Sequence, residues 1–198
     1  MNGLRKDLTT ASIAIVFMTL LLGVAYPLVT TGVSQVLFSD AANGNRIEVD
    51  GKLVGSELIG QDFRGKPGYF QSRPSATGYS ANVTYFNNLG PNSRELSRLF
   101  AKQLDAYLKR ERPYVPGLTS DDVPVDAVTT SASGVDPHIS KANARIQACR
   151  VAEVRGLSLS HVEELIAEHT DGRFLGMFGE PVVNVLQLNL ALDREAPR

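Results

Sequence analysis

The chain has 198 residues, of which 43% are hydrophobic and 21% are charged, and its formal net charge is −1. This balance gives no indication of nucleic-acid binding, which requires a basic face. The single cysteine, Cys149, excludes an intrachain disulfide and, with only three histidines, a cysteine-rich zinc cluster.

The N-terminal part contains a long run without Asp, Glu, Lys or Arg, between Asp7 and Asp40. A helix that rises 1.5 Å per residue needs about 20 apolar residues to cross a hydrocarbon core of about 30 Å. Residues 11–31 meet this length, and their apolar side chains are spread over all faces of a helix. We predict a transmembrane helix over residues 11–31, preceded by a short N-terminus at 1–10.

A cleavable signal peptide is the alternative interpretation of this run. Arg5 and Lys6 would form its basic start, and Gly23-Val24-Ala25 would form a small-residue cleavage site. The apolar run continues past that point to Phe38, which favours a retained anchor.

Pro27 interrupts the predicted helix. It has no backbone N–H, and its ring crowds the carbonyl group of Gly23, four residues earlier. Lipid cannot satisfy backbone groups that are freed in this way, so a neighbouring helix is favoured. Pro27 is therefore a candidate contact with a partner in the membrane.

The charges that flank the helix predict its orientation. Arg5 and Lys6 precede it, whereas the 20 residues after Thr31 contain Arg46 as their only cation. Because positive flanks stay on the cytoplasmic side, we expect a cytoplasmic N-terminus and an extracytoplasmic domain.

The residues after the helix are enough for one domain with its own core. We expect a juxtamembrane linker at 32–52, a single α+β domain at 53–193 and a frayed tail at 194–198. Apolar periodicity predicts helices from Asn92 to Pro113, from a cap at Asp136 or Ser140 to Arg155, and from Ser160 to His169. Strands are predicted within 53–63, 123–128 and 182–192.

The loop at 60–67 has the glycine and lysine spacing of a phosphate-binding loop. Pro67 stands where that motif needs a Ser or Thr hydroxyl and the start of a helix. We interpret the segment as a glycine-rich surface loop.

Residues 129–140 combine hydroxyl groups with a carboxylate and an imidazole. A hydrolase would use Ser131 or Ser133 as nucleophile, assisted by Asp136 and His138. Since the segment lacks a G-x-S-x-G elbow, we favour a turn or an interface that contains Ser133, Asp136 and His138.

A second candidate interface is the aromatic segment at 69–74. Tyr69, Phe70 and Arg73 are residue types that are enriched in protein interfaces. Packing of the aromatic rings under a long loop is the alternative.

Several motifs together resemble the C subunit of the Kdp-type potassium-transporting P-type ATPase of bacteria. The resemblance rests on YPLVTTG at 26–32, GSELIGQ at 55–61, YFQSRPSA at 69–76, NLGP at 88–91, PVDAVTTSASGVDPHIS at 124–140, RVA at 150–152 and GEPVVNVL at 179–186. Val182 departs from the family pattern, which has Arg at that position.

The resemblance implies a non-catalytic subunit of an inner-membrane assembly. Its partners would be a potassium-channel-like subunit and a P-type subunit that hydrolyses ATP. This chain would stabilise the assembly and act as a catalytic chaperone that raises the ATP affinity of the hydrolysing subunit. ATP would thus be bound through that partner. A membrane-tethered hydrolase and an independent extracytoplasmic binding protein are the rival classes.

Overall fold

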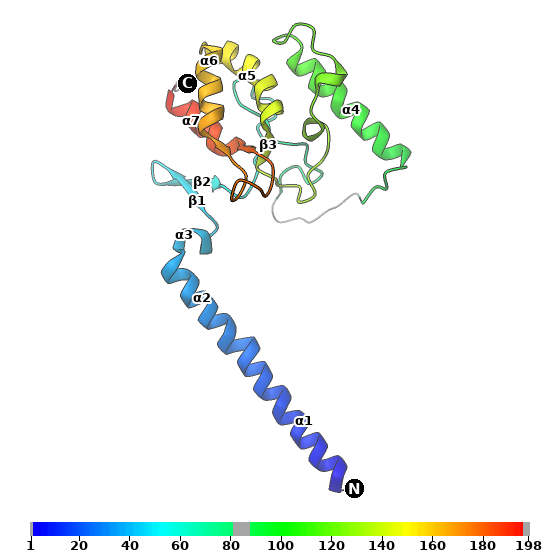
Figure 1. Ribbon diagram of the computed structural model, residues 1–198, viewed down its shortest axis with the longest axis vertical. Helices are drawn as coiled ribbons and strands as arrows, with labels where there is room; N and C mark the ends of the chain where they lie inside the picture. The colour runs from blue at the N-terminus through cyan, green and yellow to red at the C-terminus, as the bar shows by residue number, and fades with distance from the viewer. Residues whose placement is uncertain (1, 81–87, 196–198) are drawn as a thin grey trace. The chain divides into compact units, whose positions relative to one another are not determined.

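The computed structural model describes residues 2–80 and 88–195. The chain forms two compact units, Met1–Arg46 and Ile47–Arg198. The first is mainly one apolar helix, and the second is a domain of helices and short strands (Figure 1). This is the α+β class with one long N-terminal apolar helix that the sequence predicts.

The N-terminal helix is longer than the predicted span. It comprises α1 (Asn2–Leu20), a π-helical segment η1 (Leu21–Ala25) and α2 (Tyr26–Leu37). Residues Gly3–Leu37 are long and apolar enough to cross a membrane. The three segments follow one another without a break in the ribbon (Figure 1).

Pro27 is accommodated by a wider turn in the helix. Its ring crowds the preceding turn, and the backbone N–H of Tyr26 donates to the carbonyl of Leu21, five residues back. The hydroxyl of Thr30 donates to the carbonyl of Tyr26 at 2.5 Å and to that of Pro27 at 3.2 Å. Such threonine bonds help to satisfy backbone groups near a proline in a membrane helix.

The residues expected as a linker, 32–52, contain regular structure. They include the end of α2, the short helix α3 (Ser39–Ala42) and the strand β1 (Arg46–Val49), which pairs with β2 (Lys52–Ser56). Asp50 and Gly51 have φ of 51° and 71°, as a tight two-residue hairpin turn requires. The strand predicted within 53–63 therefore ends at Ser56, and a loop follows.

The three predicted helices of the domain are confirmed as α4 (Arg94–Glu111), α5 (Lys141–Arg155) and α6 (Leu159–Glu168). The predicted caps Asn92 and Ser160 were wrong by one and two residues, because Ser93 and Ser158 accept the first free backbone N–H groups. Ser140 caps α5, whereas Asp136 lies before a short strand and not at the helix start.

The strand predicted at 123–128 was wrong. This segment contains the 3-10 turn η3 (Val125–Ala127), which follows η2 (Ser120–Asp122). Both the backbone N–H and the hydroxyl of Thr129 donate to the carbonyl of Val125, which favours a turn over an extended chain. The carboxylate of Asp126 then accepts bonds from Ser140 and Asn143.

The strand predicted at 182–192 was largely wrong as well. Only β5 (Val182–Asn184) is extended, and α7 (Val185–Glu195) follows directly. The alternating leucines suggested a strand, but α7 is buried on a broad face that includes Leu186, Leu188 and Leu192. Leu, Gln and Ala also favour a helix. The predicted tail begins inside α7, and residues 196–198 lie outside the described part.

A small antiparallel sheet joins three short segments in the C-terminal half of the domain. Its strand order is β3–β5–β4, with β3 at His138–Ser140 and β4 at Thr170–Asp171. Val183 of β5 lies opposite Ile139 on one side and Thr170 on the other. The sheet thereby fixes the 129–140 loop against the start of α7.

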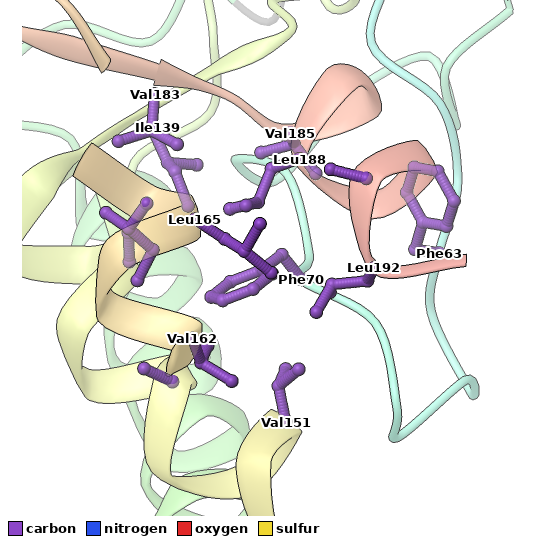
Figure 2. Close-up of a cluster of buried hydrophobic side chains, with 14 of the residues drawn as sticks. Phe63, Phe70, Ile139, Val151, Val162, Leu165, Val183, Val185, Leu188 and Leu192 are labelled. Carbon is purple, nitrogen blue, oxygen red and sulfur yellow. The ribbon is translucent and has the colours of Figure 1, made fainter. Parts of the chain in front are cut away.

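The main core lies where α5, α6 and α7 meet the loop at 63–70. Figure 2 shows Phe70 among side chains from these elements, including Val162, Leu165 and Leu188. A second, smaller cluster lies between α4 and η3 and contains Tyr107, Leu108, Leu118 and Ala127. The two clusters position the loops that carry the candidate residues.

Candidate functional site

Two loops that are far apart in sequence meet at one junction, here called the 73–136 junction after its ion pair. Arg73 Nη1 lies 3.1 Å from Asp136 Oδ2, and Arg73 Nη2 donates to the hydroxyl of Thr129 at 3.3 Å. The hydroxyl of Ser75 donates to the carbonyl of Gly134 at 2.5 Å. The backbone N–H of Ser131 donates to the carbonyl of Pro74. These contacts hold the two loops side by side.

Asp136 is the centre of this junction. Its Oδ1 accepts the backbone N–H of His138 at 3.0 Å and lies 3.4 Å from the imidazole Nδ1 of the same residue. Burial by itself would raise the pKa of Asp136, but hydrogen bonds from His138 and the charge of Arg73 outweigh burial and lower the pKa. The carboxylate is therefore ionised at neutral pH and orders both loops.

The serines of this segment have local roles. The hydroxyl of Ser133 accepts the backbone N–H of Val135, and Ser131 is buried beside Pro74. The imidazole of His138 faces Asp136, which belongs to the same turn. These contacts form a turn of neighbouring residues, whereas a catalytic triad is recognised by a nucleophile that a separate base activates.

Tyr69 and Phe70 lie apart from the junction. The hydroxyl of Tyr69 donates to the carboxylate of Asp193 at 2.8 Å, and the guanidinium of Arg155 lies 4.6 Å from the centre of its ring. Phe70 is 0% exposed, and Asn189 binds both its backbone N–H and its carbonyl. The core-packing alternative therefore describes Phe70, while Arg73, Ser133, Asp136 and His138 share the junction.

Sequence reasoning missed a buried ionic network that supports the 67–71 segment. Arg150 is 1% exposed, and its Nε lies 3.1 Å from a carboxylate oxygen of Glu111, which is 0% exposed. The same guanidinium donates to the carbonyls of Pro67 and Tyr69 and to Gln147. Arg150 shares one buried face of α5 with Asn143 and Gln147, and this helical spacing of polar residues was the available signal.

A small pocket opens between α4 and the 71–79 loop. Its volume is about 60 Å³, and its lining includes Arg64, Gln71, Tyr79, Gln103 and Arg110. Burial raises the pKa of Tyr79 to about 12, so its hydroxyl stays neutral and donates to the carbonyl of Arg73 at 2.6 Å. A volume of this size accommodates a few water molecules. The lining residue Arg110 lies 2.6 Å from Glu111, so the pocket borders the network around that carboxylate.

The loop at 60–67 packs onto the same junction. Gly60 donates its N–H to the carbonyl of Val135, and a Cβ at this position would lie 2.5 Å from the carbonyl oxygen of Asp136. The glycine is thus required for a close approach of two loops. The interpretation of 60–67 as a glycine-rich surface loop is therefore only partly correct, because the segment is a loop but buries Gly60 and Phe63.

The family comparison covers nearly the whole chain. The model of the KdpC family, described as K⁺-transporting ATPase, c chain, matches residues 8–194. A relative from Koribacter versatilis is 45% identical over 98% of this chain and 97% of its own length. One from Mycobacterium tuberculosis H37Rv is 47% identical over 96% and 100%, and one from Methylococcus capsulatus is 51% identical over 88% and 90%. Each is named Potassium-transporting ATPase KdpC subunit.

Proposed function

This chain belongs to the KdpC family of K⁺-transporting ATPase subunits, and we propose that it is a non-catalytic subunit that stabilises the assembly. The observation that carries the proposal is the match from residue 8 to residue 194, which includes the apolar helix and the domain. Its partners in the proposal are a potassium-channel-like subunit and a P-type subunit that hydrolyses ATP. The proposed site is the bacterial inner membrane.

The proposal includes a chaperone role toward the hydrolysing subunit. In this role the chain raises the ATP affinity of that subunit without carrying out chemistry itself. The 73–136 junction is the proposed contact of the domain in this role, since it presents Ser133, Asp136 and His138 in one ordered turn. Pro27 and the adjoining π-helical segment are the proposed contact in the membrane.

Co-purification tests this proposal. A tagged full-length chain, extracted in mild detergent from cells that express the whole transporter, is expected to bring down two larger membrane proteins. Removal of this chain is expected to raise the ATP concentration for half-maximal hydrolysis by roughly 5- to 150-fold, the usual range of coupling between sites. A chain that purifies alone and loses a hydrolase activity on Ser133→Ala would contradict the proposal.

We also propose that the domain lies outside the cytoplasm, because residues 5–6 carry the positive flank of the apolar helix. Any effect on ATP must then pass through the membrane helices of the partners.

Thiol labelling of intact spheroplasts tests this orientation. The reporter is Ser120→Cys on an exposed turn, in a chain whose only native cysteine is removed by Cys149→Ala. A membrane-impermeant reagent is expected to label this variant rapidly and to label a matched Gly3→Cys variant only after lysis. The opposite pattern would reverse the orientation and allow direct contact with nucleotide.

A further inference from the structure

The segment between β4 and β5 forms a hairpin with an apolar tip. Phe174 and Phe178 exchange two backbone hydrogen bonds, of 2.8 and 3.0 Å, and the N–H of Met177 donates to the carbonyl of Phe174. An ion pair of 2.8 Å between Arg173 and Glu180 closes the base of the hairpin. The tip is therefore a defined structure, here called the 174–178 tip.

The tip presents large apolar side chains to solvent. Phe174 is 72% exposed, Leu175 76%, Met177 72% and Phe178 60%. Consecutive exposed apolar side chains of this size are typical of a surface that another molecule covers. Among the other residues of the domain that the structure describes, the exposed large hydrophobic side chains, such as Leu53 and Val125, occur singly or in pairs along the chain.

The backbone of the tip carries a second unfavourable feature. Leu175 has φ of 52°, a left-handed conformation that a bulky residue rarely adopts. The adjacent Gly176, with φ of 74°, takes the same conformation without cost. A strained, exposed leucine gains nothing inside this chain, and such strain is concentrated at binding surfaces.

The composition of the hairpin favours a protein over lipid as the covering molecule. Helices that lie in the membrane surface combine Trp, Phe or Leu on an apolar face with Lys and Arg on a polar face, and Trp and Tyr are enriched at the membrane–water interface. Residues 172–180 contain no Lys, Trp or Tyr, and Glu180 neutralises Arg173. The unpaired cations of a membrane-surface segment are thus missing from the hairpin, whereas its Phe and Met residues are of types enriched in protein interfaces, where Met adapts to the shape of the partner.

The chain connection restricts which protein this can be. Residues 38–45 separate α2 from β1, and eight residues reach at most about 30 Å. The domain is therefore tethered to the apolar helix by a short connection, and a protein of the same membrane assembly is the partner most available to it. We propose that the 174–178 tip inserts into an apolar groove on another subunit of the K⁺-transporting ATPase, an inference that rests on the function proposed above.

Photocrosslinking of the full complex tests the identity of the partner. Phe174→p-benzoylphenylalanine keeps an aromatic side chain at the tip, and Val125→p-benzoylphenylalanine is the control at an equally exposed position, 72% in both cases. The variant at Phe174 is expected to crosslink to another subunit at least ten times more than the control. Crosslinks to lipid alone, equal crosslinking by the control, or none at all would each overturn the inference.

A double variant, Phe174→Ser with Phe178→Ser, tests the energetic role of the tip. We expect at least a tenfold loss of co-purified subunits compared with Val125→Ser, with an unchanged thermal midpoint of the isolated chain. If the unmodified chain brings down no subunit, the proposed function fails. If the unmodified chain and the double variant bring down equal amounts, only the inference about the tip fails.

Discussion

Replacement of Glu111 by Leu is expected to lower the free energy of unfolding by about 3–5 kcal/mol, because it leaves the buried charge of Arg150 unpaired. Burial lowers the pKa of the Arg150 guanidinium, and the carboxylate of Glu111 acts in the opposite direction. Without that carboxylate, the free-energy cost of burying the cation is no longer offset by an ion-pair partner. The same guanidinium donates to the carbonyls of Pro67 and Tyr69, so a movement of the unpaired cation would also disturb these hydrogen bonds.

Denaturant unfolding of the full-length chain in detergent measures this effect. The matched control is Glu180→Leu, which removes the exposed partner of Arg173 and should cost at most about 1 kcal/mol. A double variant, Glu111→Leu with Arg150→Met, should recover part of the loss, since no charge is then left buried. Equal stability of Glu111→Leu and Glu180→Leu would show that the buried pair does not support the fold.

The sequence predicted those elements whose local signals agree with their packing. The apolar helix has a long uncharged run, and α4 has both helical periodicity and cations in its last turn. In α5, Gly156 ends the helix with φ of 69°, as its position after the last periodic residue suggested. Local chemistry is sufficient in these cases.

The prediction failed where tertiary contacts decide between two local choices. Residues 185–192 alternate like a strand, yet they pack against two other helices, α5 and α6, and the loop at 63–70, so a helix can bury side chains of both sets. At 123–128 the carboxylate of Asp126 binds the start of α5, which requires a turn. Neither contact can be read from sequence neighbours.

The candidate site shows the same division. Arg73 and Asp136 were chosen separately, Arg73 as a residue type enriched in interfaces and Asp136 as part of a turn rich in polar side chains, and the structure brings them to 3.1 Å. Glu111 and Arg150 were not chosen, because the partners of a buried ion pair 39 positions apart carry no local motif. The 174–178 tip was also overlooked, since its exposure depends on the pairing of β4 with β5.

Phe70→Ala is expected to destabilise the domain by about 3–5 kcal/mol, the usual cost of removing a fully buried aromatic ring. The ring of Phe70 is enclosed by α5, α6 and α7 (Figure 2), and Asn189 holds its backbone on both sides, at 2.8 and 2.9 Å. Because the backbone stays fixed, the surroundings can collapse only in part around the space left by the ring. A cavity term therefore adds to the loss of buried apolar surface.

The same chain offers an exposed phenylalanine as the matched control. Phe174→Ala should change the free energy of unfolding by no more than about 0.5 kcal/mol, because its ring is 72% exposed. Thermal or denaturant unfolding of the two variants side by side separates core packing from partner binding. Phe70→Ala should lose stability and assembly together, whereas Phe174→Ala should weaken assembly alone. A Phe70→Ala chain that unfolds at the same midpoint as the unmodified chain but fails to assemble would place Phe70 at an interface, against its burial in the core.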